Sequence, residues 1–178
     1  MKIFIFITLL LSNLAYGYSY NELLLKAQSA IFPKILLLDK KLDEKLVNGK
    51  IVYVIVHEAG DYDTAIQVRR QIQKQFDHQL EQYAFEIKLV DYKEISDELQ
   101  ATAIYALNSE KHLRSVANIA ISKGIVTFSY DIANLKNGLL LSLMVEKFTV
   151  LYLNKKMLQN YHVDFVDSLY QIVRFTNE

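Results

Sequence analysis

The chain has 178 residues, of which 52% are hydrophobic and 22% are charged, so it has the size and apolar content of one packed domain and is not a disordered protein. Lysine plus arginine equals aspartate plus glutamate at 20 each, and this balance lacks the basic excess that predicts binding to nucleic acid. Cysteine is absent, which excludes disulfides, thiol chemistry and Cys-ligated metals.

The first 17 residues have the pattern of a signal peptide. Lys2 precedes an apolar run over 3–11 that is too short to span a bilayer well, and Ala15 and Gly17 supply the small residues of a cleavage site. We therefore expect cleavage after Gly17, a single mature domain over 18–178 and a periplasmic location. An uncleaved anchor is the alternative, whereas a lipoprotein is excluded because no Cys follows the run.

Helical and strand patterns begin directly behind the predicted cleavage point. Ser19 and Glu22 have the spacing of a capping box, which predicts a helix that ends or kinks at Pro33. After a turn at Asn48-Gly49, the β-branched run at 50–58 (KIVYVIVHE) predicts a strand that is buried on both faces.

The middle of the chain repeats this alternation. Its next elements are a helix within 59–80, a strand at 85–92, a short helix around 94–100 and a strand at 102–107. A further helix is expected between Ser109 as N-cap and Gly124 as C-terminal stop, followed by a fourth buried strand at 125–130.

The apolar segment 139–153 carries Glu146 and Lys147 near its middle and is shorter than the about 20 residues of a membrane span. We interpret it as an antiparallel hairpin with the charged pair at its bend. A single longer helix is the alternative, although Thr149, Val150 and Tyr152 favour a strand. Asn154 is then a candidate N-cap for a helical turn, and 164–175 has the spacing of a last helix. Together these patterns predict an α/β fold: a three-layer αβα sandwich whose mostly parallel sheet is closed by a C-terminal antiparallel hairpin.

The candidate ligand surface lies at the carboxyl end of the first strand, the edge where open α/β sheets bind ligands. His57 and Glu58 end this strand, and Asp61 and Asp63 follow it directly. The alternative is structural: Gly60 makes the turn, and Asp61 or Asp63 caps the next helix.

Two more groups extend this surface. Asp131, Lys136 and Asn137 follow the fourth strand, so they are expected near the same edge. Tyr18 and Tyr20, at the mature N-terminus, form either a patch for a protein partner or an aromatic attachment of the first helix to the body. The four histidines have no metal-ligand spacing, and neither a GxSxG turn nor a phosphate-binding glycine loop is present, so we expect no enzymatic activity, no metal and no cofactor.

The segment 124–175, GIVTFSYDIANLKNGLLLSLMVEKFTVLYLNKKMLQNYHVDFVDSLYQIVRF, resembles the YfiR-like family of small periplasmic proteins. Gly138 matches the glycine that opens the family's hairpin, and Asn154 matches the Asn that ends the following strand. Phe165, Leu169 and Ile172 fit the family's last apolar helix, although the Trp-Pro pair often found after the first helix is missing here.

This resemblance implies a non-enzymatic periplasmic regulator that binds the periplasmic part of an inner-membrane signalling protein, a diguanylate cyclase of cyclic-di-GMP signalling or a sensor kinase. Because the chain has no Cys, the disulfide redox switch of the family's best-known member cannot operate here. A small single-lobe periplasmic solute-binding module, with its ligand at the carboxyl edge of the sheet, is the alternative. The sequence leaves open which small molecule binds and whether the domain forms a homodimer.

Overall fold

The structure of the protein, a computed structural model, describes residues 17–177 as alternating strands and helices. The strands are β1 (Lys50–His57), β2 (Gln79–Leu80), β3 (Tyr83–Asp91), β4 (Ala103–Ala106), β5 (Val126–Ser129), β6 (Leu141–Val145), β7 (Thr149–Asn154) and β8 (Val173–Thr176). The α-helices are α1 (Glu22–Leu36), α2 (Tyr62–Phe76), α3 (Leu113–Lys123) and α4 (Asp167–Ile172). Short 3-10 turns are η1 (Leu42–Lys45), η2 (Ala59–Asp61), η3 (Tyr92–Glu94), η4 (Ile132–Asn137) and η5 (Lys155–Met157).

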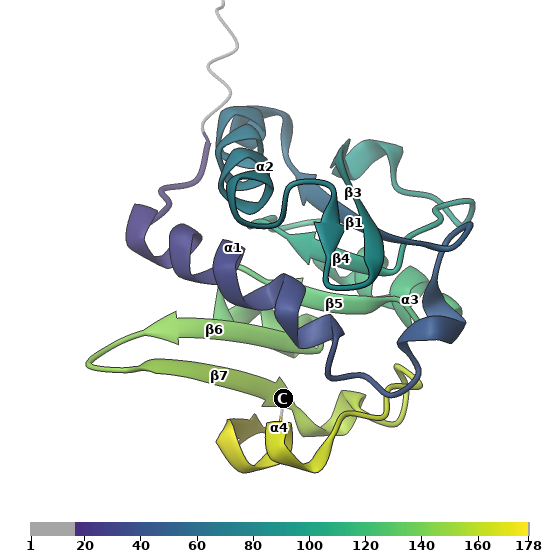
Figure 1. Ribbon diagram of the computed structural model, residues 1–178. Helices are drawn as coiled ribbons and strands as arrows, with labels where there is room; N and C mark the ends of the chain where they lie inside the picture. The colour runs from purple at the N-terminus through teal and green to yellow at the C-terminus, as the bar shows by residue number, and fades with distance from the viewer. Residues whose placement is uncertain (1–16, 178) are drawn as a thin grey trace, which may run out of the picture.

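All eight strands form one sheet, in the order β2-β3-β1-β4-β5-β6-β7-β8. Neighbouring strands run parallel except for the pairs β2–β3 and β6–β7, which are antiparallel. Figure 1 shows α1 and α2 over one side of this sheet and α3 on the other. The predicted α/β fold with a mostly parallel sheet and a C-terminal antiparallel hairpin is therefore confirmed.

The strand order reverses its direction between β1 and β4. From β1 the chain passes through α2 to β3 on one side, and from β4 it passes through α3 to β5 on the other. Because such parallel crossovers are right-handed, the two helices lie on opposite faces of the sheet. The reversal also creates a crevice at the carboxyl ends of β1 and β4, the topological switch point of the sheet.

Burial of β1 explains why its sequence is continuously apolar. Residues 51–57 are all buried, because β3 and β4 flank the strand and helices cover its faces. The predicted turn before it is confirmed: Asn48 and Gly49 have φ of 51° and 75°, and Val47 pairs with Lys50 around them. Two positive φ values are what an Asn-Gly hairpin turn requires.

The first helix differs from its prediction at both ends. Its N-cap is Asn21, whose side chain accepts a hydrogen bond from the Leu24 N–H at 3.0 Å, so the capping box at Ser19 is wrong. Pro33 lies inside the helix and does not end it. A proline in a helix interior costs about 3 kcal/mol, but burial of Ile35 and Leu36 beyond it contributes about 1.5–3 kcal/mol each, which offsets the loss.

Two predicted helices in the middle of the chain are also corrected. The helix expected around 94–100 is only the turn η3, followed by irregular chain. The next helix starts at Leu113, because the Ser109 hydroxyl accepts from the backbone N–H groups of Lys111 and His112 and stabilises a turn before α3. Gly124 ends α3 as predicted.

The C-terminal region contains the predicted hairpin and one unpredicted strand. β6 and β7 pair as expected around the charged bend. Helix α4 has only six residues, and the chain from Val173 pairs with β7 as β8, so the long last helix is wrong. The side chain of Asn154 does not cap η5, because its amide donates to the Leu135 and Leu139 carbonyls at 3.0 and 3.4 Å. In residues 173–176, hydrogen bonding of the backbone to β7 therefore prevails over the helical spacing of the side chains.

No helix within 17–177 is both long enough and apolar enough to cross a membrane. The prediction of a signal peptide falls on residues 1–17, all but Gly17 of which lie outside the described part of the chain.

A buried glutamine fixes α1 against the sheet. The Gln28 amide donates to the Tyr130 carbonyl at 2.8 Å and to the Leu143 carbonyl at 2.9 Å, while its oxygen accepts from the Tyr105 hydroxyl. Tyr53 lies on the neighbouring strand β1 and is equally buried, but its hydroxyl has no hydrogen-bond partner among the described residues. Both tyrosines therefore have a buried hydroxyl group, but only that of Tyr105 makes a hydrogen bond.

Removing each hydroxyl should have opposite effects on stability. We expect Tyr53→Phe to raise the free energy of unfolding by about 1 kcal/mol, because it deletes an unsatisfied polar group. Tyr105→Phe should lower it by about 1–3 kcal/mol, because the Gln28 oxygen loses its donor. Urea denaturation of both variants measures these changes. A loss of equal size in both variants would contradict this assignment.

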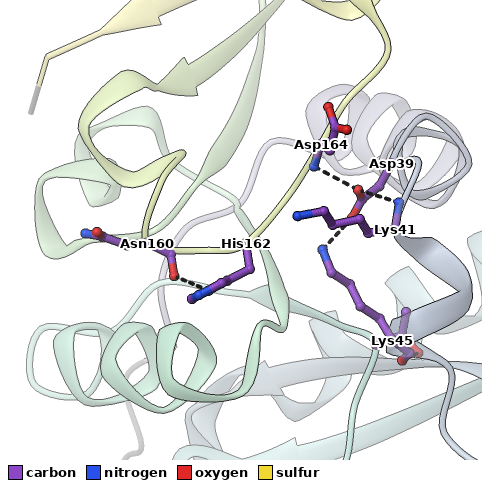
Figure 2. Close-up of polar contacts among 7 residues, drawn as sticks. Asp39, Lys41, Lys45, Asn160, His162 and Asp164 are labelled. Atoms are coloured by element: carbon purple, nitrogen blue, oxygen red, sulfur yellow. Dashed lines mark hydrogen bonds and ion pairs between the residues drawn. The ribbon is translucent and has the colours of Figure 1, made fainter.

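A buried ion pair between Asp39 and Lys45 lies just behind α1, and Asp39 also accepts a hydrogen bond from the C-terminal part of the chain (Figure 2). One Asp39 oxygen accepts from the Lys45 ammonium, and the other accepts from the backbone N–H groups of Lys41 and Asp164 at 3.1 and 3.0 Å. The Asp39 and Lys45 side chains are 1% and 9% exposed, so each charge needs the other to offset the cost of its burial. By contrast, the ion pair between Lys40 and Asp164 is half-exposed.

We expect Asp39→Asn to lower the free energy of unfolding by about 3 kcal/mol, because it leaves the Lys45 charge buried without its counterion. Urea denaturation checks this value, and the double variant Asp39→Asn/Lys45→Met should recover part of the loss. The matched control is Lys40→Met, which should cost at most about 1 kcal/mol. A double variant that is no more stable than Asp39→Asn would show that the ion pair is not the cause.

Candidate functional site

The candidate site lies at the switch point, where residues 17–21 cross the carboxyl ends of the central strands. We call this segment the N-terminal strap. The Tyr18 N–H donates to the Asp61 carboxylate at 2.8 Å, and the Asn21 N–H donates to the Tyr130 hydroxyl at 2.8 Å. Asp61 follows β1 and Tyr130 follows β5, so these contacts attach the strap to the ends of two strands.

Tyr20 lies at the centre of this arrangement. Its hydroxyl donates to the Asp61 carboxylate at 2.9 Å and accepts from the Asn108 N–H at 3.1 Å. Its ring meets the Tyr130 ring edge-to-face, with the ring centres 4.7 Å apart. Because Asp61 comes after β1 and Asn108 comes after β4, the phenol fills the crevice between the two strands.

Burial controls the protonation of this pair. Asp61 is 2% exposed, and desolvation raises the pKa of its carboxyl above the ordinary value of 3.8. Hydrogen bonds from Tyr20 and from the Tyr18 N–H, together with the nearby His57, act in the opposite direction, while Glu58 adds to the rise. Desolvation and the neighbouring Asp61 also raise the pKa of Tyr20. The phenol therefore keeps its proton and remains a donor to the carboxylate.

A surface hollow of about 610 Å³ lies beside the strap. It is lined by Gly17, Tyr18, Glu58, Ala59, Gly60, Lys93, Glu110, Lys111 and His112. Glu58 is held in place by a hydrogen bond from the Ser109 hydroxyl. Acidic and basic side chains therefore line the same hollow, which suits a small ligand that carries both charges.

A second hollow, of about 400 Å³, adjoins the end of β1. It is lined by His57, Ala59, Tyr62, Leu89, Asp91 and Glu94. The His57 Nδ1 donates to the Glu58 carbonyl at 2.8 Å. Over residues 17–177, no group of three or more His, Asp and Glu side chains is placed to hold a metal ion.

The structure brings five of the residues predicted from the sequence together at this edge. These are Tyr18, Tyr20, His57, Glu58 and Asp61. Gly60 makes the turn as expected, and its carbonyl lies so close to Gly17 that a Cβ at Gly17 would be 2.7 Å away. The Asp61 side chain does not cap α2, because both of its oxygens bind the strap.

The other predicted residues do not join these contacts. Asp63 faces outward with Arg70 and Lys74 on α2. Asp131 caps η4 through the Ala133 N–H at 2.9 Å.

β6 runs parallel to β5, so the intervening chain has to return to the opposite edge of the sheet. This return carries Lys136 and Asn137 away from the switch point. Gly138 ends η4 with a φ of 97°, a conformation that favours glycine.

Sequence reasoning missed Tyr130 and Asn108. Tyr130 lies at the carboxyl end of β5, just as His57 lies at the carboxyl end of β1. The rule that ligands bind at the carboxyl ends of parallel strands would therefore have found Tyr130. Asn108 contributes its backbone N–H, for which the residue type gives no signal.

Comparisons with known proteins agree with the fold. No family model matches the sequence, and no curated protein is significantly similar to it. A conserved domain protein from Vibrio cholerae has a similar structure, with a TM-score of 0.60 and 11% identity over 86% of this chain and 60% of that one. The ABC domain from Streptococcus pneumoniae, solved in complex with L-Trp, has a TM-score of 0.50 and 11% identity over 79% of this chain and 61% of its own. The chain thus spans about three fifths of both structures and shares their α/β fold.

The pKa of Asp61 predicts a pH dependence. Because the folded state raises this pKa, it binds more protons than the unfolded state in the pH range above 3.8, so the contribution of Asp61 to stability falls as the pH rises through that range. The variant Asp61→Asn lacks this titration. The stability of the wild type minus that of the variant should therefore be largest at about pH 3.5 and smaller at about pH 7.5, as measured by urea denaturation. A difference that increases with pH would mean that the charged carboxylate is the favoured form.

Proposed function

We propose that the protein is a single-lobe solute-binding module of the periplasm, without enzymatic activity, and that its ligand binds at the carboxyl edge of the sheet. The observation that carries this proposal is the convergence of polar groups at the switch point: the Asp61 carboxylate, the Asn108 N–H and the Tyr130 hydroxyl. Open α/β sheets bind small molecules at such points. The likeness in fold to a domain solved with L-Trp supports the same class of function.

The charges of the adjoining hollow favour a ligand with both an acidic and a basic group. Lys93 and Lys111 can pair with a carboxylate, and Glu58 and Glu110 can pair with an ammonium group. An amino acid or a similar small zwitterion has this combination.

A ligand screen tests the solute-binding function. We expect amino acids or related zwitterions to raise the melting temperature of the purified protein, since a ligand at 100 times its Kd stabilises by about 2.7 kcal/mol. The shift should be lost in Glu58→Gln. It should persist in the control Lys74→Gln, which removes a charge from the outer side of α2. A melting temperature that no solute changes would count against this function.

A second candidate is a regulator that docks onto the periplasmic part of an inner-membrane signalling protein, as the resemblance to the YfiR-like family implies. The observation that favours it is the exposure of two aromatic side chains at the same edge, with Tyr18 36% and Tyr62 49% exposed. Exposed aromatic residues are enriched at protein interfaces.

Photocrosslinking in intact cells tests this docking. A photoreactive residue at Tyr62 should capture the membrane protein, a diguanylate cyclase or a sensor kinase, whereas the same probe at the exposed Lys136 should not, because the chain has left the switch point there. Identical crosslinks from both positions, or none from Tyr62, would rule out docking at this edge.

A further inference from the structure

The crevice at the carboxyl ends of β1 and β4 is occupied by a side chain of the protein itself, Tyr20. We infer that this crevice is a binding site for an aromatic hydroxyl group, and that the N-terminal strap fills it in the manner of a ligand. The inference rests on the proposed solute-binding function for its biological use, but its structural basis is independent of it. That basis is the way in which the body of the domain surrounds the phenol.

Both polar partners of the phenol belong to the body of the domain. The Asp61 carboxylate accepts the phenol proton, and the Asn108 N–H donates to the phenol oxygen. Asp61 is 2% exposed, and without the strap it loses both the Tyr20 hydroxyl and the Tyr18 N–H. An occupant with a hydroxyl group at this point restores a donor to the carboxylate, and hydrogen bonds to charged groups are stronger than those between neutral groups.

The walls of the crevice select for an aromatic ring. The rings of Tyr20 and Tyr130 lie with their centres 4.7 Å apart and their planes at 71° to one another. This is the edge-to-face arrangement that aromatic pairs favour. The hydroxyl of the same Tyr130 points to the Asn21 N–H, which places the start of α1 next to the ring. A phenol satisfies both requirements, whereas an aliphatic alcohol lacks the ring and toluene lacks the hydroxyl.

The strap is built so that it can leave without opening the sheet. Residues 17–21 belong to no strand, and α1 begins only at Glu22. Gln28 holds the helix to the sheet by bonds of its own, so α1 does not depend on the strap for its position. A phenolic ligand therefore competes with Tyr20 for one place, and binding releases the strap.

The test replaces the internal occupant by an external one. In Tyr20→Ala, 4-methylphenol supplies the missing side chain, so it should raise the melting temperature of this variant by several degrees in a concentration-dependent manner. Toluene at the same concentration should give a much smaller shift. The double variant Tyr20→Ala/Asp61→Asn should respond to 4-methylphenol no more than to toluene. Equal shifts with 4-methylphenol and toluene in Tyr20→Ala, or no shift with either, would overturn the inference.

If Tyr20→Ala does not fold, the wild-type protein gives the answer. Hydrogen exchange of the Asn21 amide, which donates to the Tyr130 hydroxyl of the body, should become faster in 4-methylphenol while the amides of β1 remain unchanged. Unchanged exchange at this strap amide would then refute the inference.

The two proposals fail separately. A flat screen of solutes together with a specific response of Tyr20→Ala to 4-methylphenol would remove the solute-binding function and leave the phenol site. A solute that stabilises the wild type through Glu58, together with a Tyr20→Ala variant that ignores 4-methylphenol, would do the reverse.

Discussion

The position of α1 depends on one buried amide. Gln28 makes all of its hydrogen bonds to the body of the domain, to the carbonyls of Tyr130 and Leu143 and to the hydroxyl of Tyr105, and so connects the helix to three neighbouring strands of the sheet or their ends. A buried amide is stable only when its partners are in place, so these bonds restrict where the helix can lie. The strap directly precedes α1, and its location at the switch point is a consequence of this restriction.

The parts of the fold that were predictable are those in which local pattern and tertiary packing agree. β1 reads as an apolar run because it is buried on both faces, and the hairpin of β6 and β7 reads as two strands because Glu146 and Lys147 interrupt them. β8 was not predictable, because its residues continue the helical spacing of α4 and only the free edge of β7 turns them into a strand. The N-cap prediction at Ser19 was wrong for a simpler reason: Asn21 is an equally good capping residue, and packing selects it.

The candidate site shows the same division. The rule that ligands bind at the carboxyl ends of strands placed His57, Glu58 and Asp61 correctly at one edge. It failed for Lys136 and Asn137, because the parallel course of β6 takes the chain back across the sheet. The role of Tyr20 has no local signature at all, since it depends on a carboxylate and a backbone N–H that are distant along the chain.

The ion pair at Asp39 has a consequence for the order of folding. The Asp39 carboxylate accepts from the N–H of Asp164, a residue 125 positions further along the chain, so the region behind α1 is completed by a segment that is synthesised much later. Contacts of such long sequence separation close large loops and slow the folding reaction. The N-terminal third of the domain therefore reaches its final stability only after the residues around Asp164 have emerged. Until then the Asp39 carboxylate lacks one of its donors, the Asp164 N–H.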